Sequence, residues 1–133
     1  MPSPPHSPGP VDRGVRVLVV EDNVDAAETL ADLLRLWGYE VGVVYDGQAA
    51  VETAPGFRPD AVLLDIGLPR MNGYEVARWL RRQPDLGGVL LIAVTGYGQA
   101  SDRARGHEAG FDHHLVKPVD IELLRRLLSE LKH

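Results

Sequence analysis

Five polar side chains in this sequence follow or end apolar runs. Burial in a core does not explain why these positions are polar. They are Glu21, Asp22, Asp65, Thr95 and Lys117. Three carboxylates brought into one pocket would repel each other, and a hard divalent cation such as Mg²⁺ relieves that repulsion. A lysine and a hydroxyl both suit phosphate oxygens. The set therefore predicts a pocket in which a carboxylate acquires a phosphoryl group. Asp65 would be the in-line nucleophile, while the metal and Lys117 neutralise the equatorial oxygens.

The stretch from Ala61 to Gly73, A-V-L-L-D-I-G-L-P-R-M-N-G, places Asp65 at the end of a strand. Four apolar residues lead into the aspartate, and Gly67 and Pro69 turn the chain after it. A short apolar run bounded by turn residues is typical of a strand that is buried on both faces. Ligands bind at the carboxyl edge of an open parallel sheet. A carboxylate buried there needs partners.

Strands and helices are expected to alternate along the whole chain. The predicted strands are 15–20, 40–45, 60–64, 89–94 and 112–116. The predicted helices are about 23–37, 47–55, 73–82, 100–108 and 121–131. In the third helix, Arg78, Arg81 and Arg82 are expected to form a solvated face.

This alternation predicts an α/β fold, a doubly wound five-stranded parallel sheet of order 2-1-3-4-5 with five flanking helices. The strand ends lie roughly 20–30 residues apart, as right-handed crossovers require. Three strands are continuously apolar, which indicates helices on both faces of the sheet. In this order strands one, three, four and five are neighbours. The polar residues at their ends can therefore converge.

Length and composition favour one globular domain. The chain has 133 residues, enough for a single core. Its formal net charge of −5 argues against nucleic-acid binding, which needs a clustered basic face. No apolar run reaches the roughly 20 residues that cross a bilayer, so no membrane contact is expected. The absence of cysteine excludes disulfides and cysteine-bound metals, and a cytoplasmic location is the simplest interpretation. Residues 1–14 are rich in proline and are predicted to be a disordered tail or linker.

Four segments resemble those of response-regulator receiver domains. They read V-L-V-V-E-D-N, L-L-D-I-G-L-P-R-M-N-G, A-V-T-G and L-V-K-P, in this order and at the expected strand ends. The resemblance implies that residues 15–133 form a receiver domain. It also implies that Asp65 is the phosphoacceptor, that Thr95 and Lys117 contact the phosphoryl group, and that Lys117-Pro118 is a cis peptide.

The same resemblance implies a Mg²⁺ site. Asp22 and Asp65 would bind the ion together with the backbone carbonyl of Gly67, and Glu21 would act through a bound water. Gly67 offers no side chain that could position a hydrolytic water. Tyr97 could cover the site instead, so the sequence leaves the lifetime of the aspartyl phosphate open.

One position departs from the commonest pattern of the family. Three residues before Lys117, receivers usually carry Tyr or Phe, which swings inward when the threonine moves toward the phosphate. This chain has His114 there. Thr95 and His114 are therefore the expected switch residues, and an imidazole at this position would make the switch sensitive to pH.

These features favour a phosphorylation-controlled switch in a His-to-Asp relay rather than an enzyme. The partner would be a histidine kinase or a histidine phosphotransfer protein, and the only reactions would be self-phosphorylation from a phosphodonor and autodephosphorylation. Phosphorylation would shift a two-state equilibrium, and Thr95 would pass the change to the surface of the fourth helix, fifth strand and fifth helix. Self-association into a homodimer stays open.

With no output domain after Leu131, a stand-alone receiver or the terminal receiver of a hybrid histidine kinase is expected. The segments I-G-L-P, T-G-Y-G-Q and F-D-H-H-L-V-K-P favour the hybrid kinase.

Other interpretations of the same residues are weaker. A phosphatase with an aspartyl-phosphate intermediate would want a second aspartate where Gly67 stands, and the complete acidic set argues against a receiver-like scaffold that is never phosphorylated. His107-Glu108 resembles the pair phosphorylated in histidine kinases, but no dimerising helical hairpin accompanies it. His113 and His114 are poor joint metal ligands, because adjacent strand residues point to opposite faces.

Overall fold

A computed structural model describes residues 14–96 and 103–131 of the chain. The strands are β1 (Arg16–Val20), β2 (Glu40–Val44), β3 (Ala61–Asp65), β4 (Leu90–Thr95) and β5 (His113–Val116). The helices are α1 (Val24–Leu36), α2 (Gly47–Phe57), α3 (Gly73–Arg82), α4 (Arg103–Ala109) and α5 (Ile121–Leu128). Three expectations concern residues that are not described: the proline-rich tail up to residue 13, Tyr97, and the predicted start of the fourth helix at residues 100–102.

The five strands form one parallel sheet in the order β2-β1-β3-β4-β5, which confirms the predicted fold class. β1 lies between its two partners, so that Val19 is opposite Val43 on β2 and Leu63 on β3. Because all strands run in the same direction, their carboxyl ends meet along one edge of the sheet. That edge carries the polar residues that follow or end β1, β3, β4 and β5.

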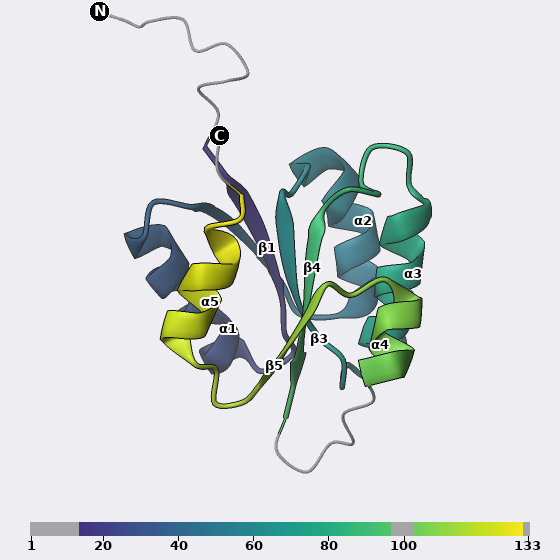
Figure 1. Cartoon of the computed structure of the whole chain (residues 1–133). Helices are drawn as coiled ribbons and strands as arrows, with labels where there is room; N and C mark the ends of the chain where they lie inside the picture. Colours follow the sequence, from purple (N-terminus) through teal and green to yellow (C-terminus); the bar gives the residue numbers. More distant parts are fainter. Residues whose placement is uncertain (1–13, 97–102, 132–133) are drawn as a thin grey trace, which may run out of the picture.

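Helices cover both faces of the sheet (Figure 1). α1 and α5 lie on one face, and α2, α3 and α4 lie on the other. Successive residues of β1 enter opposite cores, with Leu18 and Val20 packed toward α2 and α3, and Val17 and Val19 packed toward α1 and α5. This two-sided burial explains why the strands are continuously apolar. Within the described ranges, no helix is long and apolar enough to cross a bilayer.

β3 and β4 each lie one residue further along the chain than predicted, and they end in Asp65 and Thr95 themselves. Backbone pairing accounts for the difference. Asp65 is paired with Val94, the amide of Ile66 donates to the carbonyl of Val94 at 3.2 Å, and the amide of Lys117 donates to the carbonyl of Thr95 at 2.8 Å. The two polar residues are therefore held by the sheet rather than by loops. β1, β2 and β5 are each one residue shorter than predicted.

Helices α2, α4 and α5 end at residues other than those predicted. α2 continues through Pro55 to Phe57, whose ring packs against the core. Arg58 caps the end of the helix. It has a left-handed φ of 57°, and its amide donates to the carbonyl of Ala54. α5 ends at Leu128, three residues early, and α4 extends one residue further than predicted. In α2 tertiary packing has outweighed the local signal of a proline and a glycine.

The predicted solvated face of α3 is wrong for one of its three arginines. Arg78 and Arg82 are exposed. The Arg81 guanidinium instead turns toward the turn after α4, where it donates to the carbonyl of Gly110 and to Asp112. A loop carbonyl that is partly buried needs a donor, and an arginine can supply several at once.

Two leucine truncations should separate core from surface. Leu80 on α3 is 0% exposed, whereas Leu36 at the end of α1 is 83% exposed. We expect Leu80→Ala to lower the free energy of unfolding by about 2–5 kcal/mol, because it leaves a cavity. Leu36→Ala should change it by less than about 0.5 kcal/mol. Urea unfolding followed by circular dichroism measures both, and similar losses in the two variants would contradict this packing.

Candidate functional site

Three carboxylates converge at the carboxyl edge of the sheet. Glu21 and Asp22 directly follow β1, and Asp65 ends the neighbouring strand β3. One carboxylate oxygen from each residue lies within 4.8 Å of those of the others. Glu21 and Asp65 are each only 6% exposed, whereas Asp22 is open to solvent. The predicted convergence of these side chains is present in the structure, and their roles stay predictions.

Backbone amides hold one oxygen of each buried carboxylate. Asp65 Oδ1 accepts from the amide of Gly67 at 2.8 Å, and Glu21 Oε2 accepts from the amide of Asn23 at 2.9 Å. The Asn23 side chain in turn caps α1 by accepting from the amide of Ala26 at 2.9 Å. Each buried carboxylate thus has one oxygen anchored to the backbone, and its second oxygen faces Lys117.

Lys117 supplies positive charge to this cluster. Its Nζ donates to Glu21 Oε1 at 2.5 Å and to Asp65 Oδ2 at 3.4 Å. The peptide bond between Lys117 and Pro118 is cis, which confirms the expectation drawn from the family resemblance. Lys117 therefore joins the residue that follows β5 to the acids at the ends of β1 and β3.

The environment of Lys117 favours its charged form. Burial on its own lowers the pKa of Lys117, but the hydrogen bond to Glu21 and the negative charges of Asp65 and Glu21 together outweigh that effect. The net pKa is raised above the ordinary value of 10.5. The site thus retains an ammonium group at neutral pH.

The carboxylate cluster could hold a hard cation. Magnesium and calcium both take oxygen ligands, and carboxylates are the strongest of these in proteins. Glu21, Asp22 and Asp65 are the one group of three or more acidic or histidine side chains with suitably close ligand atoms in the part of the chain that the structure describes. Exposed Asp22 leaves one side of the cluster accessible to an ion from solvent.

Thr95 lies at the same edge, and its side-chain hydroxyl is held weakly. It ends β4, one residue beyond the partner of Asp65, and it is 1% exposed. Its hydroxyl is 3.5 Å from the carbonyl oxygen of Leu115, which is long for a hydrogen bond between two oxygens. Little free energy is therefore lost if the hydroxyl turns toward a better acceptor.

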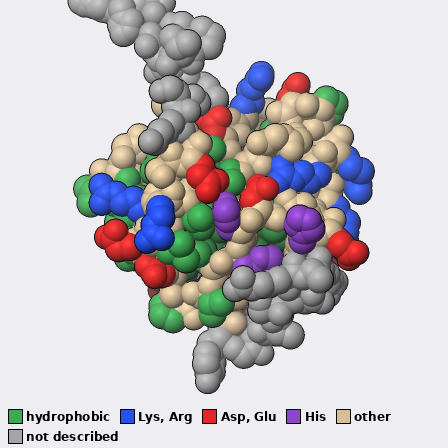
Figure 2. All heavy atoms as spheres, viewed as in Figure 1, with side chains coloured by type: hydrophobic (Ala, Val, Ile, Leu, Met, Phe, Trp, Pro, Cys, Tyr) green, Lys and Arg blue, Asp and Glu red, His purple; other side chains and the backbone are tan. Residues whose placement is uncertain are grey.

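His114 lies outside the acidic pocket, on the face of the sheet covered by α4. Its ring is 5.9 Å from that of Phe111, and it packs so closely on Gly106 that a Cβ there would overlap the imidazole. The adjacent His113 points the other way, with Nε2 3.4 Å from Glu130 of the last turn. The expectation that these two histidines diverge is confirmed. The histidines of the described residues gather on one side of the molecule (Figure 2).

An apolar groove of about 580 Å³ opens beside the acidic cluster, between α1 and the start of α5. Its apolar lining includes Ala26, Leu30, Leu33, Pro118, Val119 and Ile121. Asp65 and Lys117 line it too, so the groove leads to the cluster. Sequence reasoning missed this groove, because its residues follow the same periodic pattern as the core.

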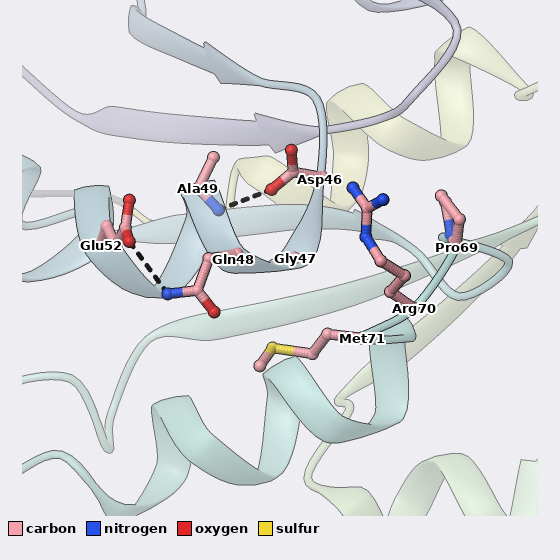
Figure 3. A pocket seen from close by; sticks show the side chains of 8 residues that line it. All are labelled: Asp46, Gly47, Gln48, Ala49, Glu52, Pro69, Arg70 and Met71. Atoms are coloured by element: carbon pink, nitrogen blue, oxygen red, sulfur yellow. Dashed lines mark hydrogen bonds between the residues drawn. The ribbon is translucent and has the colours of Figure 1, made fainter.

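A second hollow, of about 470 Å³, lies between the start of α2 and the loop after β3 (Figure 3). Asp46 caps α2 by accepting from the amide of Ala49 at 2.7 Å, and Glu52 adds another negative charge. Arg70 extends between Asp46 and Pro69. The hollow offers a phosphoryl group no surplus of positive charge. The chemistry that the sequence predicts is therefore centred on the acidic cluster.

Comparison with known proteins places this chain in a family. Residues 17–129 match the family model of the response regulator receiver domain. The chain is 39% identical over 119 residues to the response regulator MprA of Mycolicibacterium vanbaalenii, which covers 89% of this chain and 51% of that protein. The chain therefore belongs to the receiver domain family, and it spans about half the length of the curated relatives it matches.

Solved structures agree with this assignment. A chemotaxis protein of Vibrio cholerae is 26% identical, with a TM-score of 0.82 over 90% of this chain and 100% of its own. The receiver domain of a sensor histidine kinase from Pseudomonas aeruginosa is 37% identical, with a TM-score of 0.77 over 88% of this chain and 97% of its own. That structure has a magnesium ion coordinated in its active-site cleft. The chain is thus similar both to a chemotaxis protein and to the receiver domain of a sensor histidine kinase. The hybrid-kinase subtype stays a prediction.

Removing the lysine should destabilise the free protein. Lys117→Gln leaves Glu21 and Asp65 without their cation, so without divalent ions we expect the free energy of unfolding near neutral pH to fall by about 1–2 kcal/mol. The loss is smaller than for a fully buried pair, because the Lys117 side chain is 32% exposed. Since the pKa of Lys117 is raised on folding, its contribution is complete below 10.5 and is lost as the pH rises through the higher folded value.

Urea unfolding of the wild type and Lys117→Gln at a series of alkaline pH values measures this difference. Arg78→Gln, on an exposed part of α3, is the control for losing one positive charge. Equal stabilities of wild type and Lys117→Gln at neutral pH would contradict the role assigned to the ion pair.

Proposed function

We propose that this chain is the phosphoacceptor receiver domain of a His-to-Asp relay, with residues 15–133 as the domain and 1–14 as a tail or linker. The observation that carries the proposal is the convergence of Glu21, Asp22 and Asp65 around Lys117 in a chain of the receiver family. Asp65 is the acceptor. Its Oδ1 is held by a backbone amide and its Oδ2 faces the lysine, so that one oxygen is fixed and the other is presented to a donor.

The transfer is an in-line displacement. A carboxylate oxygen of Asp65 attacks the phosphorus of a phosphohistidine on a partner kinase or phosphotransfer protein. The new P–O bond forms as the P–N bond breaks, and the electron pair returns to the imidazole nitrogen, which takes a proton from solvent. Lys117 then contacts an oxygen of the phosphoryl group instead of Asp65. The weakly held hydroxyl of Thr95 donates to another phosphoryl oxygen.

The donor set fits Mg²⁺. Three carboxylates against one lysine leave two negative charges (three minus one), which one divalent cation balances. Asp22, Asp65 and the carbonyl of Gly67 would hold the ion directly, and Glu21 would hold it through water. When bound, the ion neutralises charge on the oxygens of the phosphoryl group. The magnesium ion in the receiver domain from Pseudomonas aeruginosa supports this assignment.

The groove between α1 and α5 supports the approach of a partner. Its lining is mostly apolar and includes Asp65 and Lys117. A helix that carries a phosphohistidine could bury apolar side chains there while its imidazole reaches the carboxylate. The input side of the switch is thus the face formed by α1 and the loop after β5.

The output side is the surface of α4, β5 and α5, reached through Thr95 and His114. When Thr95 turns toward the phosphoryl group, its hydroxyl leaves the carbonyl of Leu115. Leu115 directly follows His114, whose ring packs on Gly106 of α4. A local change in hydrogen bonding is thereby passed to the packing of α4.

Intact mass spectrometry with acetyl phosphate tests the acceptor. Wild type should gain one labile phosphoryl group when Mg²⁺ is present and essentially none when the ion is chelated. Asp65→Asn should gain none, because an amide is a poor nucleophile. Asp25→Asn, an exposed acid in the first turn of α1, is the matched control and should behave as wild type. A gain that persists in Asp65→Asn would refute the acceptor, and no gain in wild type would support a silent scaffold.

Thermal unfolding tests the metal site independently of phosphorylation. At a MgCl₂ concentration about ten times Kd, binding to the folded state should raise the Tm of wild type by about 5 °C. Asp22→Asn removes a proposed ligand and should abolish most of the rise, whereas Asp25→Asn should keep it. Equal rises in all three proteins would place the ion elsewhere.

A further inference from the structure

Arg81, at the end of α3, uses every N–H group of its guanidinium. Nε and Nη2 donate to the carbonyl of Gly110 at 2.9 and 2.6 Å, and Nη1 donates to the carbonyls of Gly87 and Val89 at 2.7 Å each. Nη2 also donates to Asp112 Oδ2 at 2.9 Å. These five hydrogen bonds equal the full donor capacity of an arginine. One side chain thus joins α3, the α3–β4 connection and the turn between α4 and β5.

Asp112 ties the same turn to β4. Its Oδ2 accepts from the amide of Leu91 at 2.9 Å, and its own amide donates to the carbonyl of Leu91 at 2.8 Å. Because the same carboxylate oxygen also binds Arg81, the two contacts reinforce each other. The residue that precedes β5 is therefore held from two sides.

Gly110 closes the carboxyl end of α4 in a form that suits this contact. Its φ is +110°, and its amide donates to the carbonyls of Gly106 and His107 at 3.1 and 3.0 Å. The amide of Phe111 donates to the carbonyl of Gly106 at 3.0 Å, which completes a capped helix end. A Cβ at Gly110 would lie 2.6 Å from Arg81 Cγ, so the arginine packs where only a glycine leaves room.

We infer that Arg81 is a positioning residue of the switch, the anchor that fixes the turn between α4 and β5, so that phosphorylation moves α4 and leaves this turn in place. This inference rests on the proposed function, in which the signal enters at Thr95, before α4. The turn that follows the helix is fixed by the contacts of Arg81 and Asp112. The anchor therefore keeps the motion on the surface of α4, β5 and α5.

The test follows backbone amides of ¹⁵N-labelled protein by NMR, with and without beryllofluoride and MgCl₂ as an analogue of the bound phosphoryl group. In wild type, shift changes should be large near Asp65, Thr95 and the first turn of α4, and small at Gly110 and Asp112. Arg81→Gln should take up a phosphoryl group from acetyl phosphate within about twofold of the wild-type rate, because Arg81 is remote from the acidic cluster.

In Arg81→Gln the anchor is lost. We expect solvent exchange of the Gly110 and Phe111 amides to rise about tenfold or more before any analogue is added. On adding beryllofluoride, the shift changes should spread to Gly110 and Asp112. Arg81→Lys keeps the charge with fewer donors and should be intermediate. Arg82→Gln, the exposed neighbour, should match wild type.

The outcomes separate this inference from the proposed function. If wild type takes up phosphoryl groups but Arg81→Gln responds to beryllofluoride in the same pattern as Arg82→Gln, Arg81 only stabilises the fold and the anchor is refuted. Shift changes at Gly110 in wild type as large as those in the first turn of α4 refute it without any variant. If wild type neither takes up a phosphoryl group nor responds to beryllofluoride, the proposed function fails and the anchor fails with it.

Discussion

The contact of Lys117 with Glu21 and Asp65 is the interaction on which the carboxyl edge of this sheet depends. Burying two carboxylates that are each 6% exposed costs a large free energy unless a counter-charge accompanies them. The counter-charge comes from a residue 96 positions away from Glu21 and 52 away from Asp65. The contact can form only if the residue after β5 returns to the same edge as the ends of β1 and β3, as the order β2-β1-β3-β4-β5 arranges. The electrostatics of the site and the topology of the sheet are thus two aspects of one constraint.

The same sheet separates the groove proposed for the donor protein from helix α4. The apolar groove beside the acids lies between α1 and α5, on one face. The contacts of His114 with Gly106, and of Arg81 with Gly110, concern α4, on the other side of the sheet (Figure 1). A donor protein that occupies the groove therefore leaves α4 uncovered. Helix α5 borders the groove and also belongs to the proposed output surface, whereas no described residue of α4 lines the groove.

The order of elements and the residues of the site could be predicted because both follow from local patterns. A strand buried on both faces must be apolar throughout, so its end is visible where Asp65 or Thr95 interrupts the run. The predictions that were wrong concern contacts between residues, some of them distant in the sequence. Nothing near Arg81 indicates that it will meet the carbonyl of Gly110, 29 positions away. Pro55 and Gly56 indicate a helix end that the packing of Phe57 overrides. The nucleophile and the groups that contact phosphate were inferred from residue types at strand ends, whereas the Gly67 carbonyl as a metal ligand and the water-mediated role of Glu21 came from the family resemblance.

The restraint on the Thr95 hydroxyl and the restraint on the turn after α4 are unequal. Before the helix, the hydroxyl of Thr95 is 3.5 Å from its acceptor, at the limit of a hydrogen bond. After the helix, Arg81 and Asp112 make contacts of 2.6–2.9 Å, including a charge-assisted pair. If Gly110 were held as weakly as the Thr95 hydroxyl, a ligand would loosen the helix without directing it. If the Thr95 hydroxyl were held as firmly as Gly110, the phosphoryl group would have to supply far more differential binding free energy to shift the population. A weak restraint beside the acceptor and a strong one at the far end of the helix therefore suit a switch driven by a single phosphoryl group.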